Sequence, residues 1–399
     1  MADDPWLSIV GLGEDGPDGL SRASRMALEA AEIVMGALRH LTLLPTLAAE
    51  RMEWPVPFSD GIERLLTLRG RKVVVLASGD PFWFGAGSVL ATHVEPGEWR
   101  AFPGRSTFSI VASRLGWPLE KTGCFGLHAA PLARLRPALA PDQRIIVLLR
   151  DGEAVQGLGD YLATCGFGAS QLSVFEAVGG PRERRTDSRA SDLGEQSFSH
   201  PLAVALTVEG GGPVLPLASG RPDTVFESDG QITKRAIRAM TLSALAPCHG
   251  EHLWDIGGGS GSVGIEWLLC HPSLSATTIE ARKDRADRIR SNADRLGCDR
   301  LTLVQGLAPV ALEGLMPPDA VFIGGGLSDD LMAWTTGRLG PGTRIVCNTV
   351  TLESEAVLLR WSEKIGGELS RLEIARASPL GPRRGWDHAR PIIQWSVRL

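Results

Sequence analysis

The residue pattern best suited to chemistry lies between Leu253 and Gly264, where a strand-like run leads into a glycine-rich loop, LWDIGGGSGSVG. Glycines let a backbone turn tightly and approach a nucleotide-like ligand, and Gly264 allows the following helix to pack closely on a sheet. Glu280 ends the next strand-like run, where a carboxylate can accept both hydroxyls of a ribose. This arrangement predicts a nucleoside-binding site.

The charge of Asp255, directly before the glycine loop, separates two kinds of nucleoside cofactor. A carboxylate at this position repels a pyrophosphate and attracts the ammonium and sulfonium groups of S-adenosylmethionine. We therefore predict an S-adenosylmethionine site. Two alternatives stay open at this point: NAD bound in the same loop, and a glycine-rich turn without a ligand.

Three further loops in the first half of the chain also have the residues of a binding site. Their sequences are VGLGEDG at Val10–Gly16, ASGDPFWFG at Ala77–Gly85 and PGRST at Pro103–Thr107. The first two follow strand-like runs and the third precedes a helical run. We expect the three loops to line one cleft, although the first alone would equally fit an ordinary turn between a strand and a helix.

The elements that must position these loops alternate between short apolar runs and helical patterns, which predicts an α/β fold. In the first half, the predicted strands are Leu7–Val10, Val73–Ala77, Ile145–Leu149, Leu172–Phe175 and Leu202–Val208. In the second half, we predict helices over Thr233–Ala246 and Val263–Cys270. The predicted strands there are Leu253–Ile256, Ala276–Ile279, Leu301–Val304, Ala320–Ile323, Arg344–Asn348 and Pro391–Val397, the last a candidate for antiparallel pairing.

Two domains are expected in a chain of 399 residues, because a single hydrophobic core rarely serves that length. Residues 210–229 are rich in glycine and proline without periodicity, so we predict a linker there. The predicted domains are residues 1–209 and residues 230–399.

Composition and charge argue against several partners. The formal net charge of −5 disfavours nucleic acid or an anionic membrane as the main ligand. The six cysteines show no C-x-x-C pair and no metal-ligand spacing, so we expect reduced thiols, no metal site and a cytoplasmic protein. The start MADDPWLSIV lacks the regions of a signal peptide, and no apolar run reaches the roughly 20 residues of a membrane helix.

The three loops of the first half, together with RLGWP at Arg114–Pro118, resemble the tetrapyrrole methylases. The resemblance covers roughly Trp6–Val208 and implies a two-lobed domain with its own S-adenosylmethionine site in the cleft. The residues that match the family's cofactor contacts are Ser78, Gly79, Asp80, Ser106 and Thr107.

The first loop departs from that family's common G-x-G-P-G pattern, because Glu14, Asp15 and Gly16 stand in place of the proline and its successors. Whether this loop contacts the cofactor is therefore an open question. The carboxylates of Glu14 and Asp15 are candidates for proton removal from the substrate, and an exposed acidic turn is the alternative.

The second half resembles the class I methyltransferases, whose first motif matches LWDIGGGSG. The resemblance implies a Rossmann-like domain. Leu307 stands where many of these enzymes hold the adenine amino group with an acidic residue, so the backbone is expected to make that contact. The implied cofactor positions are Thr233, Asp255, Gly257, Gly258, Gly259, Ser260, Gly261, Glu280, Gly306 and Ala308.

The fusion of these two domains resembles the bifunctional, decarboxylating methyltransferases of cobalamin biosynthesis over nearly the whole chain. The resemblance implies that the first domain methylates one meso carbon of a reduced precorrin. The second would remove carbon dioxide from the ring C acetate and methylate another meso carbon. Such a carbon is enamine-like and needs mainly alignment with the sulfonium methyl, whereas decarboxylation calls for an acid and an apolar pocket. A homo-oligomer is also implied.

The carboxylates of such a substrate are the groups that guanidinium side chains bind best. Arg182–Arg189 and Arg383–Arg390 are therefore candidates for gripping its arms, with solvated surface charge as the alternative. In the second segment, Arg383 and Arg390 are the predicted substrate ligands, and Arg384 and His388 are catalytic candidates.

A second run of glycines, Gly324, Gly325 and Gly326, follows the predicted strand Ala320–Ile323. Open α/β sheets bind substrates at the carboxyl ends of their strands, so we predict substrate contact there, with a flexible turn as the alternative. Two rival functions remain at this point, a two-domain NAD-dependent oxidoreductase and a non-catalytic tetrapyrrole carrier.

Overall fold

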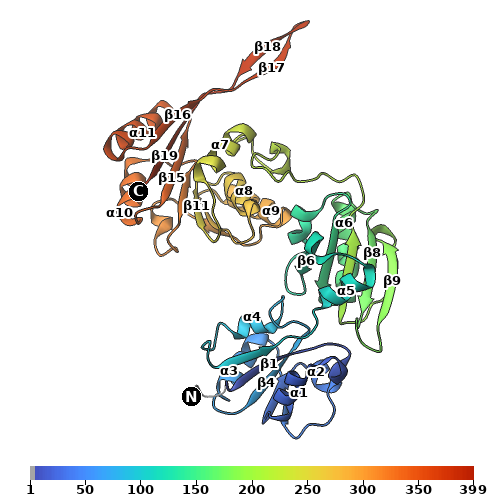
Figure 1. The fold of residues 1–399 in the computed structure, drawn as a ribbon. Helices are drawn as coiled ribbons and strands as arrows, with labels where there is room; N and C mark the ends of the chain where they lie inside the picture. Colours follow the sequence, from blue (N-terminus) through green and yellow to red (C-terminus); the bar gives the residue numbers. More distant parts are fainter. Residues whose placement is uncertain (1–4) are drawn as a thin grey trace. The chain divides into compact units, whose positions relative to one another are not determined.

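The computed structural model describes residues 5–399; residues 1–4, where the first predicted domain begins, lie outside the described part of the chain. The chain forms two compact units (Figure 1). The first comprises Met1–Ala130 and Ala138–Pro213, and the second comprises Pro131–Pro137 and Val214–Leu399. Both combine helices with sheets, which confirms the predicted α/β fold class.

The first unit begins with a parallel five-stranded sheet of order β3-β2-β4-β1-β5. Two apolar clusters cover its faces, one including side chains of α3 and α4 and the other including side chains of α1 and α2. Burial on both faces explains the unbroken apolar sequences of the central strands. The elements are β1 Leu7–Leu12, α1 Arg22–Glu29, β2 Ile33–Gly36, α2 Leu38–Leu43, β3 Glu50–Glu53, α3 Phe58–Leu66, β4 Val73–Ser78, α4 Ala86–Leu90 and β5 Trp99–Phe102.

The second sheet of this unit has the order β6-β7-β10-β8-β9. Strands β6 and β7 are parallel, and the remaining neighbours are antiparallel. Helix α5 packs on it through Phe108, Val111 and Ala112. The elements are α5 Thr107–Leu115, β6 Thr122–Gly126, β7 Arg144–Leu149, α6 Gly152–Thr164, β8 Gln171–Glu176, β9 Arg184–Arg189 and β10 Leu202–Thr207.

The second unit is built on a seven-stranded sheet of order β13-β12-β11-β14-β15-β19-β16. Strands β11 to β15 are parallel, and β19 is antiparallel to β15, as predicted for the last strand. The chain moves outward from β11 to β13 and returns to β14 on the other side of β11. Such a reversal opens a crevice at the carboxyl ends of the two strands, where ligands bind in open α/β sheets.

The strands of this unit are β11 His252–Ile256, β12 Ser275–Glu280, β13 Leu301–Gln305, β14 Ala320–Ile323, β15 Arg344–Thr349, β16 Glu368–Leu372 and β19 Ile392–Arg398. Helices and apolar clusters cover both faces. The helices are α7 Arg235–Leu245, α8 Ser262–Cys270, α9 Lys283–Arg295, α10 Asp329–Arg338 and α11 Leu352–Ile365.

A two-stranded hairpin, β17 Ala375–Leu380 and β18 Arg383–His388, projects from the second unit (Figure 1). In the sequence, the hairpin lies between β16 and β19. Strand β16 runs in the same direction as β15, because both are antiparallel to β19. The hairpin therefore leaves the sheet at the carboxyl edge.

The segment predicted as a linker packs against the second unit at several points. Leu215 and Phe226 are buried in the same apolar cluster as β11 and α8, and Arg221 is buried as well. Glycine and proline made the segment resemble a flexible tether, but two of its apolar side chains, Leu215 and Phe226, reach the core. Separately, no helix within residues 5–399 has both the length and the apolar composition to cross a membrane.

Candidate functional site

The three loops predicted in the first half converge at the carboxyl edge of adjacent strands β4, β1 and β5. The backbone N–H of Gly79 donates to the carbonyl of Leu12, and that of Gly104 donates to the carbonyl of Gly79, both at 3.0 Å. A Cβ at Gly11 would lie 1.9 Å from the Gly79 oxygen and 2.4 Å from the Gly104 nitrogen. The three backbones therefore meet at a junction that admits no side chain, which we call the glycine junction.

The polar side chains predicted to contact the cofactor here also shape the loops. Ser106 caps α5, its Oγ accepting from the N–H of Ser109 at 3.1 Å. Asp80 Oδ1 accepts from the N–H of Phe82 at 2.9 Å. Ser78 is exposed, and Thr107 is half-buried at the start of α5. The structure thus places all of them, with Gly79, around the glycine junction.

The two acidic candidates of the first loop are engaged in ion pairs. Glu14, only 7% exposed, contacts Arg39 and lies 3.3 Å from Arg182. Asp15 pairs with Arg105. Each of the two carboxylates therefore balances a guanidinium charge in this structure.

Next to Ser78 lies His40, a buried histidine that the sequence did not single out. Its Nε2 is 2.9 Å from an Arg39 nitrogen and 3.0 Å from Ser78 Oγ. Since arginine only donates, Nε2 accepts and the ring proton lies on Nδ1. Burial, aided by the charge of Arg39, lowers the pKa of His40 to about 3, so the ring is neutral near pH 7. A histidine in a helix of only six residues gave no sequence signal.

In the second unit, the predicted glycine loop joins β11 to α8 with left-handed backbone at Gly257, Gly259 and Gly261. A Cβ at Gly257 would lie 2.7 Å from the backbone of Gly325. Gly324 N–H also donates to the carbonyl of Ile256 at 2.9 Å. The two predicted glycine runs are therefore in direct contact at the crevice between β11 and β14, and Gly326 follows them with a left-handed backbone of its own.

Asp255 does not lie on the surface of this loop, although the charge argument placed it beside the cofactor. It is 1% exposed, and Oδ2 accepts from the N–H of Gly264 at 2.9 Å. Burial raises its pKa to about 7, with the Gly264 hydrogen bond opposing and the charge of Glu280 adding to the rise. The alternation of β11 points this side chain under α8, so Asp255 shapes the loop from behind.

Glu280 lies where the sequence predicted, at the carboxyl end of β12. Oε2 accepts from Gly259 N–H at 2.8 Å and Oε1 from Arg282 N–H at 2.9 Å. Each oxygen keeps a further lone pair for a ribose hydroxyl. Gly306 N–H donates to the Glu280 carbonyl at 3.0 Å, which brings the Gly306–Ala308 turn beside it. The Leu307 side chain in this turn is 73% exposed.

Residues 220–233, which we call the strap, hold Thr233 near the glycine loop. A Cβ at Gly259 would lie 3.8 Å from the Gln231 carbonyl. Asn292 of α9 is fully buried; its Nδ2 donates to the carbonyls of Glu227 and Ser260, both at 2.9 Å, so it joins the strap to the loop.

A buried ion pair anchors the other end of the strap. Glu266 of α8 accepts from Arg238 Nε at 2.7 Å and from Gly220 N–H at 2.6 Å. Arg238 also donates to the Arg221 carbonyl at 2.6 Å and to Asp223 at 3.0 Å. Sequence reasoning missed this pair and Asn292, although a polar residue among the apolar positions of α9 was a usable signal.

The arginine-rich segment near the C-terminus forms strand β18 and the base of the hairpin. Arg383, Arg384, His388 and Arg390 are all exposed there. The hairpin rises from the same edge as the glycine loop, but β14, β15 and β19 separate its base from β11. Within the described residues, no hydrogen bond or ion pair links these side chains to the glycine loop.

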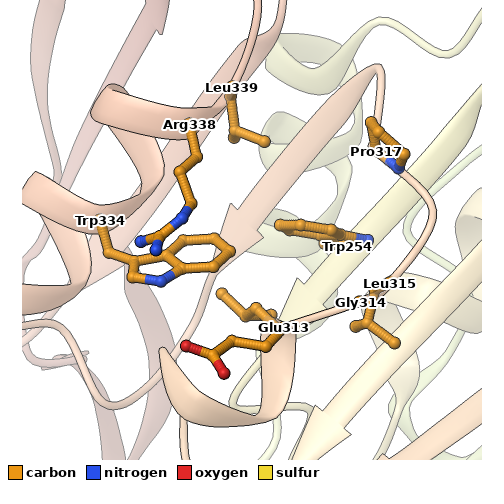
Figure 2. Close-up of a pocket in the computed structure, with 9 residues that line it drawn as sticks. Trp254, Glu313, Gly314, Leu315, Pro317, Trp334, Arg338 and Leu339 are labelled. Atoms are coloured by element: carbon orange, nitrogen blue, oxygen red, sulfur yellow. The ribbon is translucent and has the colours of Figure 1, made fainter.

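A hollow of about 460 Å³ in this unit lies away from the glycine loop (Figure 2). Trp254, Trp334 and Arg338 line it, with the Arg338 guanidinium 4.7 Å from the centroid of the Trp334 ring. No predicted cofactor or substrate ligand is among its lining residues in the described chain. Because Trp254 is mid-strand and Trp334 belongs to α10, the hollow faces the α10 side of the sheet and not its carboxyl edge.

Comparisons with known families match both halves of the chain. A model described as tetrapyrrole (corrin/porphyrin) methylases matches residues 7–194, and a precorrin methyltransferase domain matches residues 224–399. Fold and loops together define a two-domain methyltransferase, and such families use S-adenosylmethionine as methyl donor.

Individual relatives narrow the assignment. A precorrin-6Y C(5,15)-methyltransferase [decarboxylating] from Sinorhizobium is 47% identical, covering 98% of this chain and 96% of its own length. A Salmonella typhimurium cobalt-precorrin-6B C(15)-methyltransferase (decarboxylating) is 36% identical over 38% of this chain and 80% of its own. The solved C-terminal domain of a precorrin-6Y C5,15-methyltransferase from Rhodobacter capsulatus is 52% identical, covering 46% of this chain and 100% of its own, with a TM-score of 0.45.

The chain belongs to the family of precorrin-6Y C(5,15)-methyltransferases (decarboxylating). The NAD-dependent oxidoreductase, which the glycine loop alone left open, has no support in these comparisons.

Proposed function

We infer that this protein transfers methyl groups from S-adenosylmethionine to the meso carbons C-5 and C-15 of a reduced precorrin and decarboxylates its ring C acetate, in cobalamin biosynthesis. The observation that carries this inference is identity along 98% of the chain to an enzyme of that name. Two glycine-lined assemblies, one in each unit, supply the architecture that two methyl transfers need.

The direct test uses purified full-length protein, the reduced macrocycle precorrin-6B and S-adenosylmethionine. We expect a product that has gained two methyl groups and lost one carbon dioxide, measured by mass spectrometry. Macrocycle recovered unchanged would contradict the proposed function and favour a tetrapyrrole carrier.

We propose one cofactor site in each domain, with the boundaries predicted from sequence, residues 1–209 and 230–399, as the catalytic domains. In the first, the loops that meet at the glycine junction would hold the ligand; its proposed contacts are Ser78, Gly79, Asp80, Ser106 and Thr107. In the second, Glu280 would hold the ribose hydroxyls and the loop the rest; the further contacts are Thr233, Gly257, Gly258, Gly259, Ser260, Gly261, Gly306 and Ala308, with Asp255 behind them. Calorimetry with S-adenosylhomocysteine should give two molecules bound per chain.

The residues of both sites act mainly by alignment. S-Adenosylmethionine supplies an electrophilic methyl group, which an enamine-like meso carbon attacks directly. The glycine loops let the main chain approach the donor closely, and Glu280 fixes its ribose. Little acid or base strength is required for that step, which agrees with the ion-paired state of Glu14 and Asp15.

Decarboxylation is proposed for the second domain. The Salmonella relative supports keeping decarboxylation and C(15)-methylation in one domain, because both are named for a protein that matches only 38% of this chain. Separate expression of the two halves tests it. The cut belongs between Pro213 and Val214, since the strap packs on the second unit. An isolated second half that leaves the acetate intact would refute the assignment.

The hairpin arginines stay a proposal for the substrate's carboxylate arms, with Gly324, Gly325 and Gly326 facing the macrocycle at the crevice. Replacing Arg383, Arg384 and Arg390 with alanine should raise the KM for the macrocycle and leave the affinity for S-adenosylhomocysteine unchanged. A catalytic role for Arg384 or His388 requires instead that single replacements lower kcat.

We also propose a homo-oligomer, supported by the exposed Leu380 and Trp386 side chains on the projecting hairpin. Light scattering on a sized sample measures the mass directly. A Trp386→Ser variant with the same mass as the wild type would exclude the hairpin as the contact.

A further inference from the structure

A polar pocket of about 350 Å³ lies in the first unit at the end of β8 and the start of β9. Its lining is made by side chains of one sequence segment, and its two arginines belong to Arg182–Arg189, which the sequence offered as a candidate for the substrate's arms. The lining residues are Glu176, Ala177, Arg182, Arg184, Ser197, Ser199 and His200.

The pocket lies beside the first loop of the predicted cofactor site. A Cβ at Gly180, in the turn between β8 and β9, would lie 2.5 Å from the carbonyl oxygen of Glu14. Arg182 reaches from the same turn to Glu14 Oε2 at 3.3 Å. Glu14 also contacts Arg39, which donates to Ser78 Oγ at 2.9 Å. A ligand in the pocket is therefore a few side chains away from the glycine junction.

The carboxylate of the pocket already has hydrogen-bond and ion-pair partners on both oxygens, whereas the arginines of the pocket still have N–H groups to donate. Glu176 is buried, with one oxygen on Arg184 and the other accepting from Ser199 N–H at 2.8 Å. Arg184 gives one further bond, to the Ser197 carbonyl at 3.2 Å. Arg182 is 69% exposed at its side chain and gives one bond to Glu14. A guanidinium has five donors, so both arginines keep N–H groups for an incoming anion.

The electrostatic surroundings of His200 also suit an anionic ligand. Burial lowers the pKa of His200, and the positive charge of Arg39 lowers it further; Glu14 and Asp151 oppose this, and His128 adds to it. Of the neighbouring groups, His40 is neutral near pH 7, while Arg182 and Arg184 bring charge to the same wall. His200 near pH 7 is therefore a neutral ring that can donate one N–H to an anion.

We propose that this pocket binds one carboxylate arm of the tetrapyrrole, with Arg182 as its main ligand and Arg184 and His200 as supporting donors. The proposal rests on the proposed function and names the substrate group that this domain recognises. Paired guanidinium N–H groups match the two oxygens of a carboxylate, and the turn against Glu14 would set the distance from the arm to the glycine junction. The methionine carboxylate of the cofactor has the same chemistry, so the experiment must separate the two sources.

The test uses the full-length protein with Arg182→Gln. Transfer of an isotope-labelled methyl group to each meso carbon is followed separately, and calorimetry measures affinity for S-adenosylhomocysteine. For the methylation by the first domain, we expect KM for the macrocycle to rise about tenfold, with kcat within about twofold of wild type and cofactor affinity unchanged. Arg182→Lys should fall between, because it keeps the charge and loses the paired geometry.

Arg71→Gln is the matched control, since Arg71 belongs to the same unit, pairs with Glu32 on the surface and does not line the pocket. It should leave all three quantities unchanged, and thermal melting should show that each variant folds. An unchanged KM in Arg182→Gln overturns the proposal, as does weaker S-adenosylhomocysteine binding with unchanged KM, which would assign the pocket to the cofactor. Wild-type protein that methylates neither carbon refutes the proposed function itself, and the pocket assignment with it.

Discussion

The glycine-lined sites of the two units differ in how many loops form them and in the acidic groups nearby. In the first, three loops from adjacent strands β4, β1 and β5 meet backbone to backbone, and the acids nearby are paired with arginines. In the second, one loop turns over a single strand, and two buried carboxylates, Asp255 and Glu280, lie at or near neighbouring strand ends. If both bind the same donor, the first selects it mainly by shape and the second by shape together with the charge of Glu280.

The largest expected effect is a loss of stability that is confined to the second unit. Arg238→Met would leave the buried Glu266 with only the more distant Arg221 guanidinium, at 3.8 Å, and breaking such a buried pair costs about 4 kcal/mol. We expect amide exchange to accelerate in α7, α8 and the strap and to stay unchanged in the first unit. Arg371→Met, which breaks only the exposed pair with Glu373, is the control. Equal exchange in both variants would mean that the buried pair does not hold the strap.

The next largest effect is a loss of methylation by the first domain alone. Gly11→Ala places a methyl group into the glycine junction, which should destabilise it by about 3 kcal/mol or displace a loop. Methylation by the first domain should be lost, while the second methyl transfer persists on a suitable macrocycle. Gly97→Ala, where a Cβ would meet nothing within 4 Å, serves as control. Full activity in Gly11→Ala would show that the loops can separate without loss.

The pH dependence of stability should have opposite signs in the two units. Asp255 has a folded pKa of about 7, above its ordinary value of 3.8, so its contribution to stability is complete below pH 4 and is lost as the pH rises through 7. His40 has a folded pKa of about 3, below 6.5, so its contribution is present above pH 6.5 and is lost as the pH falls through 3.

Asp255→Asn should therefore remove the part of the decline in the second unit between pH 4 and pH 7 that comes from ionising this carboxyl. His40→Gln should remove part of the loss in the first unit below pH 6.5. Denaturant unfolding of each variant, compared with wild type across that range, measures both. A decline in Asp255→Asn as steep as in wild type would mean that this carboxyl is not protonated in the folded protein.

The smallest expected effect concerns cofactor affinity in the second unit. Asn292→Asp keeps the acceptor for Glu227 N–H but replaces two N–H donors with an oxygen facing two carbonyls. We expect about tenfold weaker binding of S-adenosylhomocysteine at one of two sites. Ser291→Ala, on the exposed side of the same turn of α9, should leave both sites unchanged. Weakening at both sites would show that the effect is not confined to the loop beside Asn292.

Local sequence was sufficient to predict the strand, glycine loop and helix from Leu253 to Cys270, the antiparallel last strand, and the loops at Gly11, Gly79 and Gly104. Each of these depends on a short-range cause: apolar periodicity, or a backbone that only glycine tolerates. The same reasoning placed Glu280 correctly, because a strand end fixes the position of its last residue.

Tertiary structure alone decided what those residues touch. Asp255 reads as a charged neighbour of the cofactor, yet the side to which β11 turns it is set by packing under α8. Residues 210–229 read as a linker, yet Leu215, Phe226 and the Arg238–Glu266 pair bind this segment to the core. Sequence by itself determined which backbone shapes this protein can form and where its strands end. Burial, ion pairing and the meeting of loops far apart in the chain depend on long-range packing, which no local pattern records.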